Sequence, residues 1–578
     1  MYYEYISIIN HKRKQMHFLD WTVLLLYILL IIAIGTWVSR KNKGFDSIAI
    51  ADKSLPWWVI GFSLIAANIS AEQIIGMSGS GFAIGLAIAS WEWMAAITLI
   101  IVAKFFLPVF YKEGIKTIPQ FAEHRYSKQL KTILAIFWIF LFILVNLTSV
   151  MFLGAKMIDT IIQDRDIMII AIVILALITL AYSIKGGLMS IAFTDYIHVG
   201  ILVIAGFFLA YKVLNSLGHG NAADNISYLM EHFPQKFKMI IRDGAHITPN
   251  GTNAYMDIAG LSVLIGGLWI TNLYYWGFNQ YIIQRTFAAK NLQEAQKGVA
   301  FAGYLKLLVP ILVILPGIVA YVMLAGPDGK VTIDTIHEFG ATYMIRSDGS
   351  IDNDRAYPMM INLFMQTPFL GIIIAAILGA IISSLGSMAN AIGTIFTEDI
   401  YIPYFSKGQQ KNTIKSYRVA VVASLLIAVI IAPNLGNFDQ LFTYIQASTG
   451  IISPGILSIF LFGIFWRKTT NKAAIWGVIV PFFIALGLKA AELIYVGHHG
   501  PESTFNRPFF VMPYLQQMAV TLISSVIIVV TISLVEGKGN DNEKAIRLNP
   551  GLFRTSRKFN ISAIIIAVIL IILYSYFW

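Results

Sequence analysis

The chain contains no cysteine and has few charged side chains. Its 578 residues include no Cys, and only 13% are Asp, Glu, Lys or Arg, against about 25% in ordinary globular domains. The absence of cysteine excludes disulfides, thiol catalysis and cysteine-ligated metals. No HExxH motif is present either, so nothing indicates an intramembrane enzyme.

Apolar residues dominate instead. Hydrophobic residues make up 57% of the chain, and the mean hydropathy is +0.71. This composition predicts an all-α integral membrane protein embedded in a lipid bilayer. The net charge of +11 could suggest a nucleic-acid partner, but the basic residues lie between apolar stretches, where membrane topology explains them better. We therefore expect no nucleic acid.

Fourteen apolar stretches are long enough to cross a hydrocarbon core of about 30 Å. They cover residues 21–39, 57–82, 89–111, 132–161, 167–184, 192–211, 259–287, 299–324, 368–401, 418–432, 441–465, 473–494, 518–534 and 561–578. The polar connections 212–258 and 325–360 are long enough to hold short surface helices.

Lysine and arginine indicate the orientation. Most of the 42 basic residues fall in alternate connections, and the positive-inside rule assigns those connections to the cytoplasm. Both ends of the chain are then predicted outside a plasma (inner) membrane. Lys12, Arg13 and Lys14 argue the other way, but three charges do not outweigh the remainder.

Polar runs interrupt two of the apolar stretches at matching places. The first run is residues 66–73 and the second is residues 271–280. Unpaired polar groups in hydrocarbon are costly, so such helices must be broken inside the protein. Broken helices at equivalent points of two repeats mark the substrate and ion sites of transporters.

The spacing of the apolar stretches suggests one lead helix followed by two repeats of five helices each. The predicted parts are a tail and lead helix (1–55), a first repeat (56–212), an external loop (213–257), a second repeat (258–465) and three further helices (466–578). An odd number of spans in each repeat forces opposite orientations, which gives an inverted repeat.

Several polar residues lie inside these spans. Ser383 and Ser384 form a hydroxyl pair suited to sodium, although small residues also pack transmembrane helices. Glu92 and Lys306 are intramembrane charges and therefore functional candidates. Alternatively, Glu92 lies at an interface and Lys306 snorkels. The tryptophans Trp93, Trp269 and Trp276 are interpreted as packing or interface residues.

Six segments resemble the solute:sodium symporter family, most closely its sodium/glucose and sodium/galactose cotransporter branch. They are Asn68-Ile-Ser-Ala-Glu-Gln73, Ala89-Ser-Trp-Glu-Trp93, Asn272-Leu-Tyr-Tyr-Trp-Gly-Phe-Asn-Gln280, Gln284-Arg-Thr286, Ala380-Ile-Ile-Ser-Ser384, and Tyr444-Ile-Gln446 with Ser453-Pro-Gly455. The resemblance runs nearly the whole length of the chain. It implies a LeuT-type inverted repeat and sodium-coupled uptake by alternating access.

The resemblance also implies an ion site. The sodium ligands would be the backbone carbonyls of Ala66, Ile69 and Ala380 together with the hydroxyls of Ser383 and Ser384. Asp195 matches a family acid near the sodium route, although an acid near a helix start can also be a simple N-terminal cap.

A sugar site is implied in the same way. Its predicted hydrogen-bonding residues are Gln73, Glu92, Asn272, Lys306 and Gln446. Tyr275 would stack beneath the sugar ring as the inner gate, steadied by Asn68. Met77, Trp91 and Phe442 would close the outer side.

Three positions depart from the family pattern. Trp91 replaces a tyrosine in the outer gate, Ala95 replaces a serine that contacts the sugar, and Gly386 stands where members with a second sodium site carry a hydroxyl. One sodium per cycle is therefore expected, and the choice between glucose and galactose stays open, as does the oligomeric state. The function expected is sodium/hexose symport. The alternatives are symport of another organic solute, or a non-transporting sugar sensor or channel.

Overall fold

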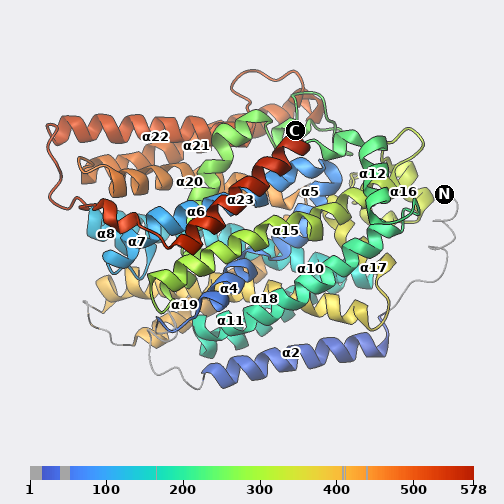
Figure 1. Cartoon of the computed structure of the whole chain (residues 1–578), viewed down its shortest axis with the longest axis horizontal. Coiled ribbons are helices and arrows are strands. Elements are labelled where there is room, and N and C mark those ends of the chain that lie inside the picture. Colours follow the sequence, from blue (N-terminus) through green and yellow to red (C-terminus); the bar gives the residue numbers. More distant parts are fainter. Residues whose placement is uncertain (1–15, 40–52, 164–165, 407–408, 410–411, 438–439) are drawn as a thin grey trace.

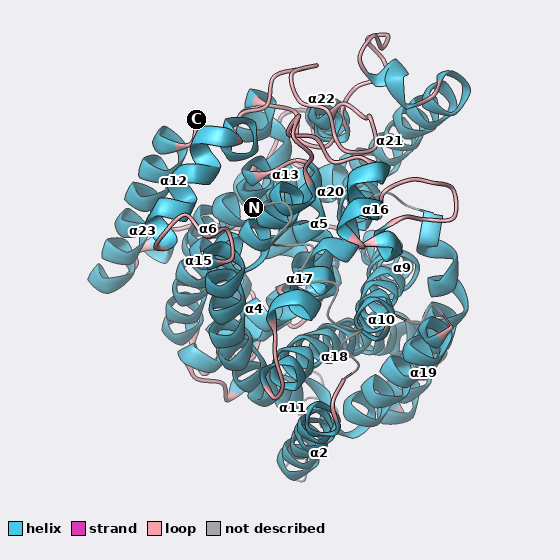
Figure 2. Ribbon diagram, turned by 90° about the vertical axis from the view of Figure 1, so that its right-hand side faces the viewer, coloured by secondary structure: helices cyan, strands magenta, loops and turns pink. Residues whose placement is uncertain are grey.

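The computed structural model describes residues 16–39, 53–163, 166–406, 409, 412–437 and 440–578. Within these residues the chain is a bundle of helices without a β-strand (Figures 1 and 2). The N-terminal tail, with Lys12, Arg13 and Lys14, lies outside the described residues.

The helices follow the predicted spans closely. The first part contains α2 (Phe18–Ser39), α4 (Trp57–Asn68), α5 (Met77–Ala83), α6 (Ser90–Ile101), α7 (Leu107–Lys112), α8 (Ile118–Arg125), α9 (Lys128–Leu141), α10 (Thr148–Ile162), α11 (Ile167–Asn215) and α12 (Ala222–His232). The second contains α13 (Leu268–Phe278), α14 (Gln280–Phe287), α15 (Leu292–Leu324), α16 (Ile333–Phe339), α17 (Ala356–Phe364), α18 (Phe369–Ile395), α19 (Thr413–Ile431) and α20 (Leu441–Phe465). The last three are α21 (Asn471–His499), α22 (Tyr514–Glu536) and α23 (Arg557–Tyr576).

Eleven helices of the described chain are long and apolar enough to cross a membrane, or twelve if the bent pair Trp57–Asn68 and Glu72–Ala83 is one span. Of the fourteen predicted spans, the two others fall on the shorter apolar helix Ile167–Ala181 and on the pair α13 and α14. The count of fourteen therefore stays a prediction. As expected, the two long polar connections hold short helices, α12 in the first and α16 in the second. Helix α17 begins within the second connection, but it extends beyond residue 360 and is mostly buried.

The element labelled α11 contains two apolar helices, Ile167–Ala181 and Leu188–Asn215, which correspond to two predicted spans, and both contact α2. Ile170 and Ile178 lie with Trp21 and Ile28 around one cavity. Further along, Ser190 donates a hydrogen bond to the carbonyl of Gly35. His198, later in the chain, shares a hydrogen bond with Tyr27, which lies earlier in α2 than Gly35. The order of these contacts indicates that the chain doubles back between the two spans.

The two long connections and several basic loops lie at opposite ends of the bundle. In Figure 1, α12 and α16 lie toward the right end, whereas α7 and α8 lie toward the left end. Near α8, Lys544 donates to the carbonyl of Tyr126, and Lys112 of α7 donates to that of Arg547. The assignment of the basic end to the cytoplasm stays a prediction.

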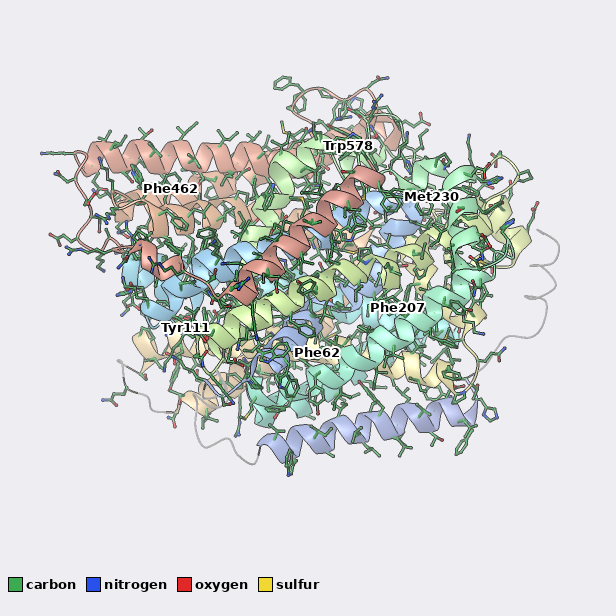
Figure 3. All side chains as sticks on the ribbon, in the orientation of Figure 1. Phe62, Tyr111, Phe207, Met230, Phe462 and Trp578 are labelled. Atoms are coloured by element: carbon green, nitrogen blue, oxygen red, sulfur yellow. The ribbon has the colours of Figure 1, made fainter. Side chains whose placement is uncertain are left out.

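The centre of the bundle is formed by α4, α5, α15 and α18, whose side chains are mostly buried. The outer helices carry exposed apolar side chains. Figure 3 shows two of them, Phe207 on α11 and Trp578 beyond α23, on the face toward the viewer. An apolar outer surface of this extent is what a lipid-embedded bundle requires.

Candidate substrate and ion site

The first predicted helix break lies between α4 and α5. Helix α4 ends at Asn68 because Ile69 has φ −74° and ψ 81°, which leaves the helical region. The hydroxyl of Ser70 then accepts the N–H of Glu72 at 3.1 Å and so caps the next helical turn. The two halves are bent by 59°. The polar run thus breaks the helix where the sequence predicts.

Two glycines let the second half of this broken helix approach its neighbours. A Cβ on Gly76 would lie 3.1 Å from the Cβ of Phe442 on α20. A Cβ on Gly79 would lie 2.8 Å from a carboxylate oxygen of Asp354. These close contacts seat this half of the helix, which carries Met77, against the start of α20 on one side and against Asp354, just before α17, on the other.

A loop lysine secures the far end of α5. Lys236 is buried, and its Nζ donates to the carbonyls of Phe82 and Ala83 at 2.9 and 3.0 Å. The same Nζ lies 3.5 Å from the ring centroid of Tyr321. Burial lowers the pKa of Lys236 well below its usual range. The outer loop thus supplies the C-terminal partners that α5 lacks.

The second break separates α13 from α14 at a single residue. Asn279 has φ −87° and ψ 117°, and its carbonyl accepts the N–H groups of Ile282 and Ile283 at 3.2 and 3.0 Å. The side chain of Gln280 accepts the N–H of Ile118 at 2.8 Å. This break leaves Asn272 and Tyr275 on α13, facing the first broken helix.

A narrow cavity lies between the two broken helices, α6, α15 and α20. Its volume is about 30 Å³, and its lining contains all ten side chains predicted for the sugar and the gates. The lining residues are Asn68, Gln73, Met77, Trp91, Glu92, Ala95, Thr271, Asn272, Tyr275, Trp276, Lys306, Phe442, Gln446 and Thr449. Space of this size suits one or a few water molecules. A hexose would therefore need the walls to move apart.

The two intramembrane charges meet at this cavity. Lys306 Nζ donates to Glu92 at 2.5 Å and also to the side-chain oxygen of Asn68. Lys306 is 1% exposed and Glu92 is 2% exposed, so neither the snorkelling nor the interfacial alternative is correct. Trp276 is not only a packing residue, because its ring lines the cavity 5.2 Å from the lysine nitrogen.

Sequence reasoning missed Glu72. This buried carboxylate accepts a hydrogen bond of 2.7 Å from Gln446 Nε2. The available signal was its place in the polar run beside Gln73. Two other predicted sugar residues also bond to the protein itself: Gln73 accepts from the Ser70 hydroxyl at 3.2 Å, and Asn272 donates to the Leu268 carbonyl at 3.1 Å. Several polar side chains of the closed cavity therefore already have hydrogen-bond partners within the protein.

Both predicted gates are closed in this conformation. At the predicted outer gate, Trp91 and Phe442 meet edge to face with ring centroids 5.5 Å apart, and Met77 is fully buried. At the predicted inner gate, the Tyr275 hydroxyl accepts hydrogen bonds from Asn68 at 3.0 Å and Tyr281 at 2.7 Å. The cavity is thus enclosed between two sets of aromatic side chains.

The predicted ion residues lie where α18 meets the end of α4. Ser384 Oγ donates to the carbonyls of Ala66 and Ala67 at 3.2 and 3.3 Å. Ala380 precedes Ser384 by about one turn of α18, and Ile69 is the first residue beyond α4. Ser384 therefore connects the hydroxyl pair to the carbonyls exposed by the break.

Ser383 points in a different direction. Its hydroxyl donates to Asp195, which also accepts from Ser63. Arg285 lies 3.6 Å from the same carboxylate and donates to the Ser63 hydroxyl at 2.8 Å. Asp195 is buried in the middle of α11, so the helix-cap alternative is wrong. This cluster links α4, α11, α14 and α18.

These oxygens suit a monovalent cation better than a transition metal. The described residues contain no group of three or more His, Cys, Asp or Glu side chains that could hold a metal ion. The hydroxyl and carbonyls at the end of α4 are neutral hard ligands. Two broken helices around an enclosed polar cavity define a secondary transporter, and its working parts are binding groups and gates rather than catalytic groups.

Comparison with known proteins identifies the family. Residues 49–481 match the model of the sodium:solute symporter family. A sodium/glucose cotransporter from Vibrio parahaemolyticus is 46% identical over 567 residues, which cover 97% of this chain and 98% of that protein. Sodium/glucose cotransporter 1 from Oryctolagus cuniculus is 28% identical, over 89% of this chain and 78% of that one. The chain belongs to the sodium:solute symporter family.

The fold agrees with this assignment. A sodium-coupled sialic acid symporter, solved with substrate in an outward-open state, superposes with a TM-score of 0.71 at 18% identity and covers 90% of this chain and 98% of that one. The predicted LeuT-type fold is therefore confirmed. The protein is a multi-pass membrane symporter and not an enzyme, and sodium is its coupling ion.

Proposed function

We propose that this protein takes up a hexose, glucose or galactose, together with sodium by alternating access. The observation that carries the proposal is the cavity lining. Four amide side chains, those of Asn68, Gln73, Asn272 and Gln446, line it together with the Glu92–Lys306 pair and the ring of Tyr275. This is the chemistry that a ring of hydroxyl groups with apolar faces requires. The name of the Vibrio relative, a sodium/glucose cotransporter, supports the same substrate class.

The internal pairing of the cavity suggests how sugar would bind. Several polar groups now bond to a protein neighbour, as in Gln446 with Glu72 and Lys306 with Glu92. Sugar hydroxyls would replace or join these bonds as Trp91 and Phe442 separate and close again. Because unpaired buried polar groups are costly, a ligand without matching hydroxyls would be rejected.

Sodium would bind where Ser384 reaches the end of α4. Ligands from Ala66, Ile69, Ala380, Ser383 and Ser384 would join the broken helix to α18, with Asp195 along the ion's route. The ion would take the place of the hydrogen bond that Ser384 now makes to Ala66. Separation of α4 from α18 would then release sodium inward and free Tyr275 to move.

Coupling requires that sodium and sugar each bind one conformation better than the other. One positive charge moving inward gains about 2.3 kcal/mol per 100 mV of membrane potential. We also propose a plasma (inner) membrane location, the repeat boundaries 56–212 and 258–465, and an orientation with both chain ends outside. The basic loops, which gather at one end of the bundle, would then be cytoplasmic.

Uptake into proteoliposomes tests the proposal. An inward sodium gradient should concentrate labelled galactose or glucose, and an equal potassium gradient should not. Sialic acid, offered as the competitor because of the structural neighbour, should not displace the hexose. Sodium-driven uptake of sialic acid alone would instead favour symport of another organic solute. Sodium-independent equilibration of the sugar, with neither accumulation nor counterflow, would favour a channel, and binding without transport would favour a sensor.

A matched pair of variants assigns the uptake to the cavity. Glu92→Gln removes the charge that holds Lys306, whereas Thr98→Ala, on the same helix, removes a buried hydroxyl that bonds only to the Met94 carbonyl. We expect uptake to fall in the first variant and to persist in the second.

A further inference from the structure

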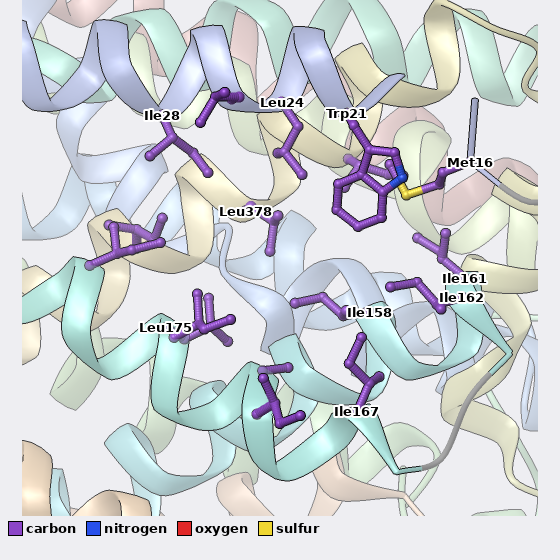
Figure 4. A pocket seen from close by; sticks show the side chains of 17 residues that line it. Met16, Trp21, Leu24, Ile28, Ile158, Ile161, Ile162, Ile167, Leu175 and Leu378 are labelled. Atoms are coloured by element: carbon purple, nitrogen blue, oxygen red, sulfur yellow. The ribbon is translucent and has the colours of Figure 1, made fainter. Parts of the chain in front are cut away.

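A second cavity lies between the lead helix and the core, and nothing in the proposed cycle uses it. It has a volume of about 300 Å³ and is bounded by α2, α10, α11 and α18 (Figure 4). Its lining consists of isoleucine, leucine and alanine with one methionine and one tryptophan, and it presents no polar surface. Figure 4 shows Trp21, Leu24 and Ile28 facing Ile158 and Leu175 across the space.

Water is a poor occupant of such a space. A buried water needs polar partners, and an apolar cavity of about half this volume, engineered in another protein, stays dry and takes up apolar molecules. An empty cavity loses the dispersion contacts that its lining atoms would otherwise make. The physical preference is therefore for an apolar occupant.

The cavity is continuous with the surface that faces lipid. Several of its lining side chains are also exposed on the outside of the bundle: Trp21 is 45%, Leu25 is 58%, Ile170 is 57% and Ile174 is 48% exposed. In a multi-pass membrane protein that surface lies against acyl chains. Acyl chains of the surrounding lipid are therefore in position to enter the cavity.

The shape of the cavity also suits an acyl chain. On α11 its lining extends from Ile167 to Ile178, a length of about 16 Å at the helical rise of 1.5 Å per residue. The space therefore runs along the helices, in the direction that lipid chains follow. Trp21 lies near the start of α2, and tryptophan favours the level of the headgroups. The polar end of a lipid would stay there, outside the cavity.

We propose that this cavity binds one acyl chain of a membrane phospholipid. The chain fills the space between α2 and the core and packs against Leu378 and Ile382 of α18. Ile382 directly precedes Ser383, so the lipid supports the helix that carries the hydroxyl pair. This inference rests on the membrane-embedded fold and not on the identity of the transported solute.

The test compares variants that fill the cavity with one that does not. Ile174→Trp and Ala171→Phe place a larger side chain in the cavity, because both residues line it. Leu177→Trp is the matched control: Leu177 is 59% exposed on the same helix and lies outside the lining. Each purified protein is titrated with dioleoylphosphatidylcholine in detergent, and bound lipid is counted by native mass spectrometry.

We expect wild type and Leu177→Trp to retain one bound lipid. In both filled variants the affinity for this lipid should fall by about tenfold or more, which corresponds to roughly 1.4 kcal/mol of binding free energy. Lipid should also raise the melting temperature of wild type more than that of the filled variants, because a ligand of the native state stabilises it. Gel filtration and sodium-driven uptake confirm that the variants fold.

Equal lipid retention in all four folded proteins would overturn the proposal. Retention of detergent or free fatty acid in place of the phospholipid, lost in the filled variants, would overturn the choice of occupant. If both filled variants fail to fold, Ala171→Val, a smaller change in the same lining, replaces them in the same lipid titration. Lipid retention equal to that of wild type would again contradict the proposal.

Discussion

Both broken helices interrupt the helical backbone within a span, but the groups that each break makes available differ. At the first break, Ser70 caps the new helix by its side chain, and the carbonyls of Ala66 and Ala67 accept from Ser384 on another helix. At the second break, the carbonyl of Asn279 is occupied by its own helix. The first broken helix therefore offers backbone oxygens to α18 as well as side chains to the cavity, whereas the second broken helix offers side chains.

The difference matches the chemistry of the two proposed ligands. Sodium needs several neutral oxygens at short range, which an unwound backbone supplies. A hexose needs donors and acceptors spread around a ring, together with an aromatic platform, and α13 places Asn272 and Tyr275 in the cavity lining, where we propose that they serve this purpose. An inverted repeat can thus place an ion site and a sugar site on equivalent helices without making them alike.

Ser384→Ala tests the proposed ion site at the first break and has the largest expected effect. Loss of one ligand should cost about 1–3 kcal/mol, or roughly 5- to 150-fold in sodium affinity, and sodium-driven accumulation in proteoliposomes should collapse. Ser424→Ala is the control, because that buried hydroxyl bonds only within α19 to Val421. Wild-type accumulation by the Ser384 variant would show that the ion site is elsewhere.

Gln446→Ala tests the proposed sugar site, which is built from side chains rather than from backbone oxygens. It leaves Glu72 without its 2.7 Å partner and removes a predicted sugar ligand. We expect sugar affinity at saturating sodium, measured by calorimetry, to fall by about 5- to 150-fold. Gln517→Ala, which removes a similar amide–carboxylate bond to Glu492 on the outer helices, should leave affinity unchanged. An unaltered affinity in the Gln446 variant would move the sugar site.

Tyr275→Phe sharpens the comparison within the second broken helix. The ring that would face the sugar remains, but hydrogen bonds with Asn68 and Tyr281 are lost. A typical hydrogen bond contributes about 0.5–1.5 kcal/mol, so inward release of labelled sugar should accelerate several-fold while outer binding changes little. Tyr274→Phe, which loses only a bond from Trp138, is the control. Equal release rates in both variants would exclude Tyr275 as the inner gate.

Ala95→Ser has the smallest expected effect. Ala95 lines the cavity without a hydroxyl, and a site that lacks such a bond discriminates weakly between epimers. Wild type should therefore bind glucose and galactose with similar affinity, and the serine should favour one epimer several-fold, about the effect of one hydrogen bond. Strict selectivity in wild type, or an equal gain for both sugars, would contradict this reading of Ala95.

Local patterns predicted much of the fold. The stretch 441–465 matches α20 at both ends, and the run 66–73 contains the first break. These features depend on apolar length and on the cost of polar groups in hydrocarbon, both of which are properties of a continuous segment. The sites in detail came from the family resemblance, since no single segment contains both partners of a contact.

What the sequence determined by itself is therefore the class: a helical membrane protein with two broken helices and buried polar residues on specific spans. Only the tertiary structure decided that Glu72 holds Gln446, and that Ser383 turns to Asp195 while Ser384 turns to Ala66. The same holds for the doubling back of α11 and the apolar cavity beside α2. These features join segments up to several hundred residues apart, and their geometry depends on how whole helices pack, which no local pattern encodes.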